Sequence, residues 1–197
     1  RPVKRSGRRR FLKYGALSLA PASFPASGRA FWSGAGGSAS TFGTDDIRGT
    51  IFKNDAPESL WKWSKEGFSF ERLADKRVAC GICPNRCVLA PGDRSVCRSK
   101  VNLGGTLYTL AYGNPCAVHV DPIEKKPLFH YKPRTRAFTI ATTGCSFRCL
   151  NCQNWGISQA KPHEVRHVEL FPPDVVSEAV RSGSASVAYS YSEATTY

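Results

Sequence analysis

The fold is decided by Ala141-Thr-Thr-Gly-Cys145-Ser-Phe-Arg-Cys149-Leu-Asn-Cys152-Gln-Asn-Trp155, which carries three cysteines at C-x3-C-x2-C spacing. This stretch directly follows an apolar run, Ala137-Phe-Thr-Ile-Ala141, that predicts a β-strand. A [4Fe–4S] cluster has four irons and usually takes four cysteines. A set of three cysteines therefore leaves one iron free to bind a molecule that is not protein.

A zinc site and simple burial are the two alternatives for these cysteines. Zinc prefers four ligands, often in C-x2-C pairs, and no fourth cysteine lies close by in the sequence. Free cysteines are often buried as small hydrophobic residues. Three of them close together after Gly144 are an unusual arrangement for that role. Ligand count and spacing favour the iron–sulfur interpretation over both alternatives.

The C-x3-C-x2-C motif after a first barrel strand resembles the signature of the radical S-adenosylmethionine (SAM) enzymes. The resemblance implies that Cys145, Cys149 and Cys152 hold a [4Fe–4S] cluster whose open iron binds SAM. It also implies an enzyme that reductively cleaves SAM to a 5′-deoxyadenosyl radical, which abstracts hydrogen from a substrate. In such enzymes the cofactors supply the chemistry, and the protein positions and shields them.

Several motifs together resemble the radical SAM enzyme of the AmmeMemoRadiSam system, a group described as related to the pyruvate formate-lyase activating enzyme. The resemblance covers roughly residues 70–197. It implies a low-potential electron donor and a protein or small-molecule substrate, and one implied activity is installing a glycyl radical on a partner enzyme. The motifs, in order, are Cys80-Gly-Ile-Cys83-Pro-Asn-Arg-Cys87 with Cys97, Tyr112-Gly113, Asp121-Pro-Ile-Glu-Lys-Lys-Pro-Leu128, the cluster motif and Cys152-Gln-Asn-Trp155-Gly-Ile-Ser-Gln159.

Two positions depart from the family pattern. The residue before the last cluster cysteine is often aromatic and lies near the adenine; here it is Asn151, so adenine contacts must come partly from elsewhere. The second strand of the family tends to end in Thr-Tyr-Asn/Thr-Glu-Pro-Thr, whereas Ser192 and Ala194 flank Glu193 here. By position Glu193 resembles the residue near the methionyl amine of SAM. The alternative for Glu193 is an exposed terminal glutamate.

The segment after the cluster loop predicts a helix and a second strand. Pro172–Arg181 has prolines at its start and Gly183 just past its end, as amphipathic helices often do, and 186–190 reads as a strand. A strand–helix–strand unit opens a parallel α/β barrel, whose active site lies at the carboxyl ends of its strands. The predicted fold class is therefore α/β, the N-terminal part of a partial (β/α)6 radical SAM barrel. Because radical SAM barrels contain more strand–helix repeats than this sequence supplies, we expect the chain to be a fragment that turns over no substrate by itself.

A second cysteine set precedes this unit. Cys80, Cys83, Cys87 and Cys97, with glycine and proline turns between them, can converge on one metal. Four protein ligands would close the site, which favours a structural or electron-relay role. The spacing does not separate an iron–sulfur cluster from zinc, and reduced buried thiols are the other interpretation. Only Cys116 lies outside the two sets, an arrangement that argues against a secreted disulfide scaffold.

The order of these motifs predicts four regions. The linker contains one expected helix, Pro57–Glu66, because proline and an acidic residue suit a helix start. After the four-cysteine segment, 101–112 and 116–120 read as the two arms of a hairpin around the turn 113–115. The regions are a signal and leader (1–44), a linker with one helix (45–79), the four-cysteine segment with the hairpin (80–132) and the start of the barrel (133–197).

The leader resembles a targeting segment. Gly7-Arg-Arg-Arg-Phe-Leu-Lys13 is similar to the twin-arginine export signal, and the apolar stretch 14–20 is too short to span a bilayer. This predicts export to the periplasm without a transmembrane span. The cytoplasm is the alternative compartment, because SAM and low-potential donors are found there, and a disordered basic tail is the alternative interpretation of the segment. The chain contains no methionine, so we expect its true start to be missing.

The net charge of +13 is concentrated in the leader. Residues 1–44 hold eight basic residues and no acidic ones, which leaves 20 basic and 15 acidic residues, or +5, from Asp45 onward. A nucleic-acid-binding domain would carry clustered Lys and Arg on its folded body. We therefore expect no nucleic-acid partner.

Overall fold

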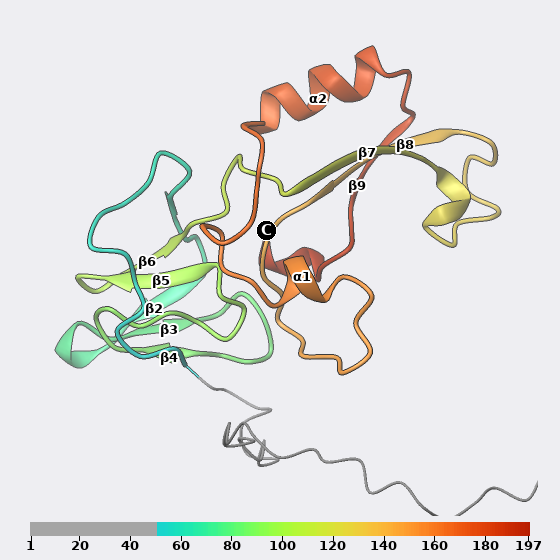
Figure 1. The fold of residues 1–197 in the computed structure, drawn as a ribbon. Coiled ribbons are helices and arrows are strands. Elements are labelled where there is room, and N and C mark those ends of the chain that lie inside the picture. Colours follow the sequence, from blue (N-terminus) through green and yellow to red (C-terminus); the bar gives the residue numbers. More distant parts are fainter. Residues whose placement is uncertain (1–50) are drawn as a thin grey trace, which may run out of the picture. The chain divides into compact units, whose positions relative to one another are not determined.

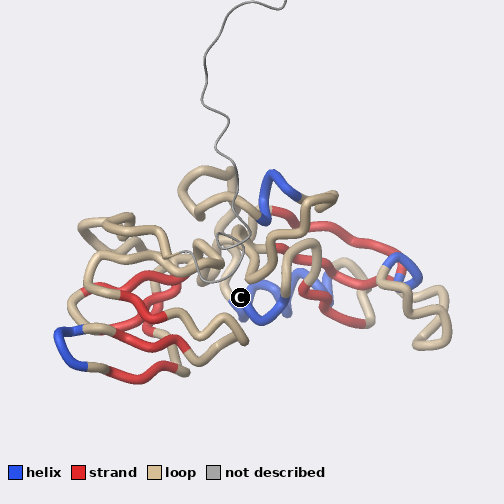
Figure 2. Tube along the Cα trace, turned by 90° about the horizontal axis from the view of Figure 1, so that it is seen from below, coloured by secondary structure: helices blue, strands red, loops and turns tan. Residues whose placement is uncertain are grey.

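The computed structural model describes residues 51–197, and Figure 1 shows their fold. The predicted signal and leader, residues 1–44, lie outside the described residues. The described part contains three small sheets connected by extensive loops and turns (Figure 2). None of its helices is long and apolar enough to cross a membrane.

The first sheet has the strand order β1-β6-β5 and is antiparallel throughout. Its hairpin turns at Gly104 and Gly105, whose φ angles of +64° and +94° suit the tight two-residue turns that join adjacent strands. The strands are β1 (Lys65–Glu66), β5 (Lys100–Leu103) and β6 (Thr106–Thr109).

The predicted hairpin partner was therefore wrong. The hairpin forms within the first predicted arm, and the second arm becomes β7 (Ala117–Pro122), which pairs with β8 (Arg136–Ala141) instead. Two glycines with positive φ allow the tighter reversal. The connector 113–115 instead runs beside residues 168–170, because the Pro115 and Gly113 carbonyls accept hydrogen bonds from the Val168 and Leu170 N–H groups.

The helix predicted for Pro57–Glu66 was also wrong, since no helix is assigned to these described residues. A local turn replaces its middle: the Trp61 N–H donates to Ser64 Oγ at 2.9 Å, and the Ser64 N–H donates to the Trp61 carbonyl at 3.0 Å. Serine side chains compete with helical hydrogen bonds in this way. Trp61 also packs edge-on against His163, and β1 takes the last two residues of the predicted helix.

The second sheet, β2-β3-β4, carries the start of the four-cysteine segment. Its strands are antiparallel, and apolar side chains beneath them form a buried cluster with cysteines among them. The 3₁₀-helix η2 (Ala74–Lys76) precedes β3. The strands are β2 (Phe70–Arg72), β3 (Val78–Cys80) and β4 (Val88–Leu89), and the cluster is Val78, Cys80, Cys87, Leu89, Val96 and Leu107.

The third sheet, β7-β8-β9, contains the strand that leads into the cysteine loop. Strand β8 pairs antiparallel with β7 and parallel with β9 (Ser186–Tyr189). The 3₁₀-helix η3 (Ile123–Lys125) follows β7 and η4 (Ala194–Thr196) follows β9. Five of the six residues of β8 are buried, as its apolar run predicts.

Helix α2 (Pro172–Arg181) connects β8 to β9 and packs on this sheet (Figure 1). Val175 and Ala179, one helical turn apart, are buried against Phe138 and Ile140 of β8. The helix begins at tandem prolines and ends before Gly183, which has a φ of +64°. The predicted strand, helix and parallel strand are present, and the barrel that they would open stays a prediction.

Candidate metal centre

The C-x3-C-x2-C loop follows the carboxyl end of β8 and runs from the core to the surface. Cys145 is buried, Cys152 is half-buried and Cys149 is exposed. The short helix α1 (Trp155–Ser158) closes the loop, and its Ile157 carbonyl accepts a hydrogen bond from the Gly144 N–H at 2.9 Å. The loop therefore returns to its own starting point and holds the three thiols on one short segment.

Gly144 is required at the start of this loop for two reasons. Its φ is +94°, a conformation that side chains other than hydrogen rarely allow. In addition, a Cβ atom at this position would lie 2.2 Å from the Cys97 carbonyl oxygen. The backbone of the C-x3-C-x2-C loop thus rests directly on the backbone of the four-cysteine segment.

The thiols of the loop have hydrogen-bonding partners that suit cluster ligands. The Phe147 N–H donates to Cys145 Sγ at 3.4 Å, and Ser158 Oγ lies 3.3 Å from Cys152 Sγ. Hydrogen bonds to sulfur tune iron–sulfur clusters, so the donor set fits a [4Fe–4S] cluster chemically. Among residues 51–197, no three Cys, His, Asp or Glu side chains are already at metal-binding spacing. The three thiols would have to converge when the cluster binds.

Glu193 lies beside the cysteine loop. Its carboxylate accepts a hydrogen bond from Ser146 Oγ at 3.4 Å, and Ser146 follows Cys145 directly. The Thr195 N–H donates to the same carboxylate at 3.2 Å, and the Thr195 hydroxyl also donates to it. Glu193 is half-buried, so it differs from the exposed terminal glutamate of the alternative interpretation.

Further bonds join the segment after β9 to the loop after β8. Asn154 Nδ2 donates to the Tyr191 carbonyl at 2.9 Å, and Ser192 Oγ donates to the Thr142 carbonyl at 3.1 Å. Tyr191 has a φ of +68°, which is uncommon for a residue with a side chain. The carboxyl ends of two parallel strands are thereby joined into one site.

Sequence reasoning left the role of the Asp121 motif open, and the structure places it next to this site. Asp121 accepts hydrogen bonds from Lys125 at 2.8 Å, Lys126 at 2.9 Å and the Tyr191 hydroxyl at 2.8 Å. Desolvation alone would raise the pKa of Asp121, but these donors outweigh it and hold the pKa well below its usual range. Tyr191 therefore joins the two regions, because its hydroxyl donates to Asp121 and its backbone carbonyl accepts a hydrogen bond from Asn154.

The four-cysteine segment brings its members to one region. Cys80 and Cys87 belong to the same buried cluster, Cys97 is buried beside Val96 of that cluster, and Cys83 is half-buried. Burial raises the pKa of the Cys80 thiol and raises that of Cys87 to about 11. Burial would do the same to Cys97, but the Lys100 ammonium and two serine hydroxyls outweigh it and lower its pKa.

The two cysteine sets are also linked through a side chain. Asn85, between Cys83 and Cys87, donates from Nδ2 to the Ser146 carbonyl at 2.9 Å. Together with the contact between Gly144 and Cys97, this bond places the two sets side by side. Neither contact could be read from the sequence, because the partners are about 50 to 60 residues apart.

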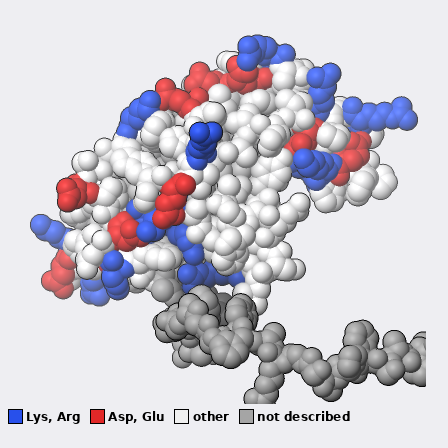
Figure 3. All heavy atoms as spheres, in the orientation of Figure 1, with Lys and Arg blue, Asp and Glu red and all other residues white. Residues whose placement is uncertain are grey.

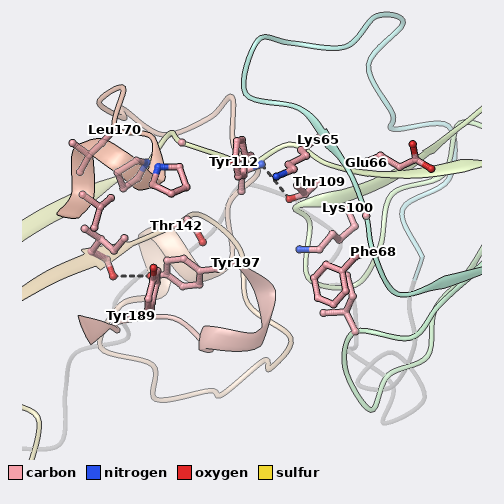
Figure 4. Close-up of a pocket in the computed structure, with 18 residues that line it drawn as sticks. Lys65, Glu66, Phe68, Lys100, Thr109, Tyr112, Thr142, Leu170, Tyr189 and Tyr197 are labelled. Atoms are coloured by element: carbon pink, nitrogen blue, oxygen red, sulfur yellow. Dashed lines mark hydrogen bonds between the residues drawn. The ribbon is translucent and has the colours of Figure 1, made fainter. Parts of the chain in front are cut away.

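An apolar pocket of about 380 Å³ lies near this region, and none of the cysteines lines it. Figure 4 shows Lys100 pointing toward the side of the pocket that carries Thr142 and Tyr197. The Lys100 ammonium donates to the Thr196 carbonyl at 2.6 Å and is almost fully buried. The pocket therefore combines apolar walls with a positive charge that is already hydrogen-bonded. Its other walls include Phe68, Tyr112, Leu170 and Tyr189.

The chain is similar to an uncharacterized archaeal protein. No family model matches the chain, and no solved structure matches it. The uncharacterized protein MJ0808 of Methanocaldococcus jannaschii is 44% identical over 133 residues, which make up 68% of this chain and 40% of that protein. The chain thus spans well under half the length of this relative.

Proposed function

We propose that this chain carries the cluster-binding part of a radical SAM enzyme. The observation that supports this best is the position of the C-x3-C-x2-C loop. It follows strand β8, next to the end of the parallel strand β9. The Ser146 hydroxyl in the loop donates a hydrogen bond to the Glu193 carboxylate at 3.4 Å. In parallel α/β sheets, ligands bind at the carboxyl ends of adjacent strands.

The residues of the loop have separate roles in this proposal. Cys145, Cys149 and Cys152 would hold a [4Fe–4S] cluster, which would leave one iron free for SAM. When bound, the cluster would supply the electron that cleaves SAM to methionine and a 5′-deoxyadenosyl radical. Glu193 accepts a hydrogen bond from the amino group of SAM, and Ser146 keeps the Glu193 carboxylate beside the loop.

The 5′-deoxyadenosyl radical would then abstract hydrogen from a protein or a small molecule. Installing a glycyl radical on a partner enzyme is one such reaction, and the electron comes from a low-potential donor. The twin-arginine-type signal supports export of the folded, cluster-loaded protein to the periplasm, with the cytoplasm as the alternative compartment.

The first test is electron paramagnetic resonance of the anaerobically reconstituted and reduced protein, with and without SAM. We expect a [4Fe–4S] signal that SAM perturbs, because the cofactor binds the open iron directly. Cys149→Ala should lose the signal, since it removes one of the three ligands. Cys116→Ser is the matched control, because this cysteine lies outside both sets, and it should behave like the unmodified chain.

The alternative is a non-enzymatic module that binds iron–sulfur or zinc and transfers electrons. In a protein that contains the complete barrel, reductive formation of 5′-deoxyadenosine from SAM separates the two functions, because an electron-transfer module does not form it. If that protein has a reducible cluster that is indifferent to SAM and forms no 5′-deoxyadenosine, the result would favour the module and count against the enzyme.

A further inference from the structure

The four-cysteine segment is distinct from the proposed SAM cluster and has a geometry of its own. Cys80 ends β3 and Cys87 immediately precedes β4, so the two face each other across a hairpin. The Cys80 N–H donates to the Cys87 carbonyl at 2.9 Å. Cys83 lies in the turn between them, and therefore three thiols are held by one hairpin.

The fourth thiol reaches the same region from a later part of the chain. Val96 packs in the buried cluster that contains Cys80 and Cys87, and Cys97 follows it. The exposed fractions of Cys80, Cys87 and Cys97 are only 5%, 6% and 6%. Cys97 Sγ lies 3.0 Å from Ser95 Oγ and 3.3 Å from Ser99 Oγ, so polar groups surround this buried thiol.

We propose that Cys80, Cys83, Cys87 and Cys97 bind one tetrahedral metal ion, zinc, and that this ion braces the loop that carries Cys145. Four thiolates suit a closed, structural zinc site. Each thiol releases its proton to solvent as it binds. Among the described residues no three donors are at metal-binding spacing, so the four thiols would have to move together as the ion binds.

Packing and charge favour a single ion over a second cluster. Val78, Leu89 and Leu107 pack in the same buried cluster as Cys80 and Cys87, and close packing of apolar side chains favours one small ion over a bulkier four-iron cluster. Four thiolates around Zn²⁺ leave two negative charges. Lys100, which is buried and acts electrostatically on Cys97, offsets part of that charge.

The bracing follows from the two contacts between the cysteine sets. Asn85, inside the metal-binding turn, donates to the Ser146 carbonyl, and the Cys97 carbonyl lies against Gly144. Both contacts involve residues within or next to the four-cysteine set, and both end on residues next to Cys145. Fixing the four thiols therefore fixes the two points on which the cluster loop rests.

Metal analysis of the full chain tests the site. The cluster-null variant, Cys145→Ala, Cys149→Ala and Cys152→Ala together, should lose its iron and keep about one zinc ion per chain. Cys83→Ser should lose the zinc, and Cys116→Ser, the matched control, should keep it. The cluster-null variant lacks the proposed SAM site, so its zinc content tests the four-cysteine site independently of radical SAM activity.

Two further measurements protect the test against misfolded variants. Cobalt(II) added to metal-free cluster-null protein should give the absorption of a tetrahedral thiolate complex. In the same protein, zinc should slow amide hydrogen exchange in residues 142–149 by roughly tenfold or more, a change that a site without bracing would not cause. Three results would overturn the proposal. The cluster-null variant could bind iron and sulfide, it could contain no zinc, or zinc could slow amide hydrogen exchange only in residues 80–97.

Discussion

Gly144 is the residue at which strain and close contact coincide. We expect Gly144→Ala to lower the free energy of unfolding by roughly 3 kcal/mol or more, because the new Cβ would lie 2.2 Å from the Cys97 carbonyl at a φ of +94°. Urea denaturation measures this loss. The variant should also bind less iron, since the loop that carries Cys145 must move.

Gly183 and Gly156 distinguish the effect of a positive φ from the effect of the close contact with Cys97. Gly183→Ala shares the positive φ but has open space around it, so it should cost only about 1 kcal/mol. Gly156→Ala lies in α1 with neither feature and should be neutral or slightly stabilising. Equal losses at Gly144 and Gly183 would show that the contact with Cys97 does not matter.

Asp121 should make the stability of the fold depend on acidity. Its pKa is lowered in the folded state, so its contribution is fully present above the unfolded pKa of about 3.9 and is lost as the pH falls toward the lower folded value. Asp121→Asn should lower the free energy of unfolding by roughly 3 kcal/mol at neutral pH, because it leaves the Lys126 ammonium, on a side chain only 10% exposed, without its charged partner. The difference between the two proteins should shrink below about pH 4 in a urea-denaturation series.

A surface ion pair provides the control for Asp121. Glu178 pairs with Arg181 on the exposed side of α2. Glu178→Gln should therefore change the free energy of unfolding by less than about 1 kcal/mol. If Asp121→Asn changed the free energy of unfolding as little as Glu178→Gln at every pH, the hydrogen bonds of Asp121 with the lysines and Tyr191 would contribute nothing to stability.

At the scale of the elements, helix α2 packs on the sheet β7-β8-β9 through one of its faces. Val175→Ala should cost about 2 kcal/mol in urea denaturation, because it removes methyl groups packed against Phe138 and Ile140. Val180→Ala on the same helix is the control, since this side chain is 74% exposed. Equal effects at the two positions would mean that the helix does not depend on this packing.

The elements that sequence reasoning predicted correctly are those with local causes. The run 137–141 gave β8, and prolines followed by Gly183 bounded α2. The helix expected at Pro57–Glu66 failed because Ser64 and a distant histidine, His163, decide that segment. The arm 116–120 was correctly read as extended, but alternation does not reveal which strand pairs with it.

At the scale of the whole molecule, charge separates the leader from the rest of the chain. On the face in Figure 3, acidic groups lie among the basic ones over the described residues. Removing residues 1–44 lowers the formal charge from +13 to +5. Any RNA binding by the full chain should therefore weaken steeply with salt and largely disappear in the shortened chain, as measured by fluorescence anisotropy. Salt-sensitive binding by residues 45–197 would revive a nucleic-acid substrate.

The candidate site could be predicted only in part. Cysteine spacing in the sequence indicated both sets, because metal ligands leave a recognisable pattern. It could not show that Asn85 bonds to Ser146, or that Glu193 lies beside the same loop, because chain topology creates these contacts. The network of Asp121 and Tyr191 was missed for the same reason, although its sequence motif was visible.

Strand β9 has one further consequence. In the described part of the chain it pairs only with β8, so its other side presents backbone groups without a strand partner. Such an unpaired edge can pair with a strand from another molecule. Concentrated samples of this chain are therefore expected to self-associate through β9. Sedimentation velocity over a range of protein concentrations would register that self-association. Dilute samples should therefore limit this self-association during the spectroscopy.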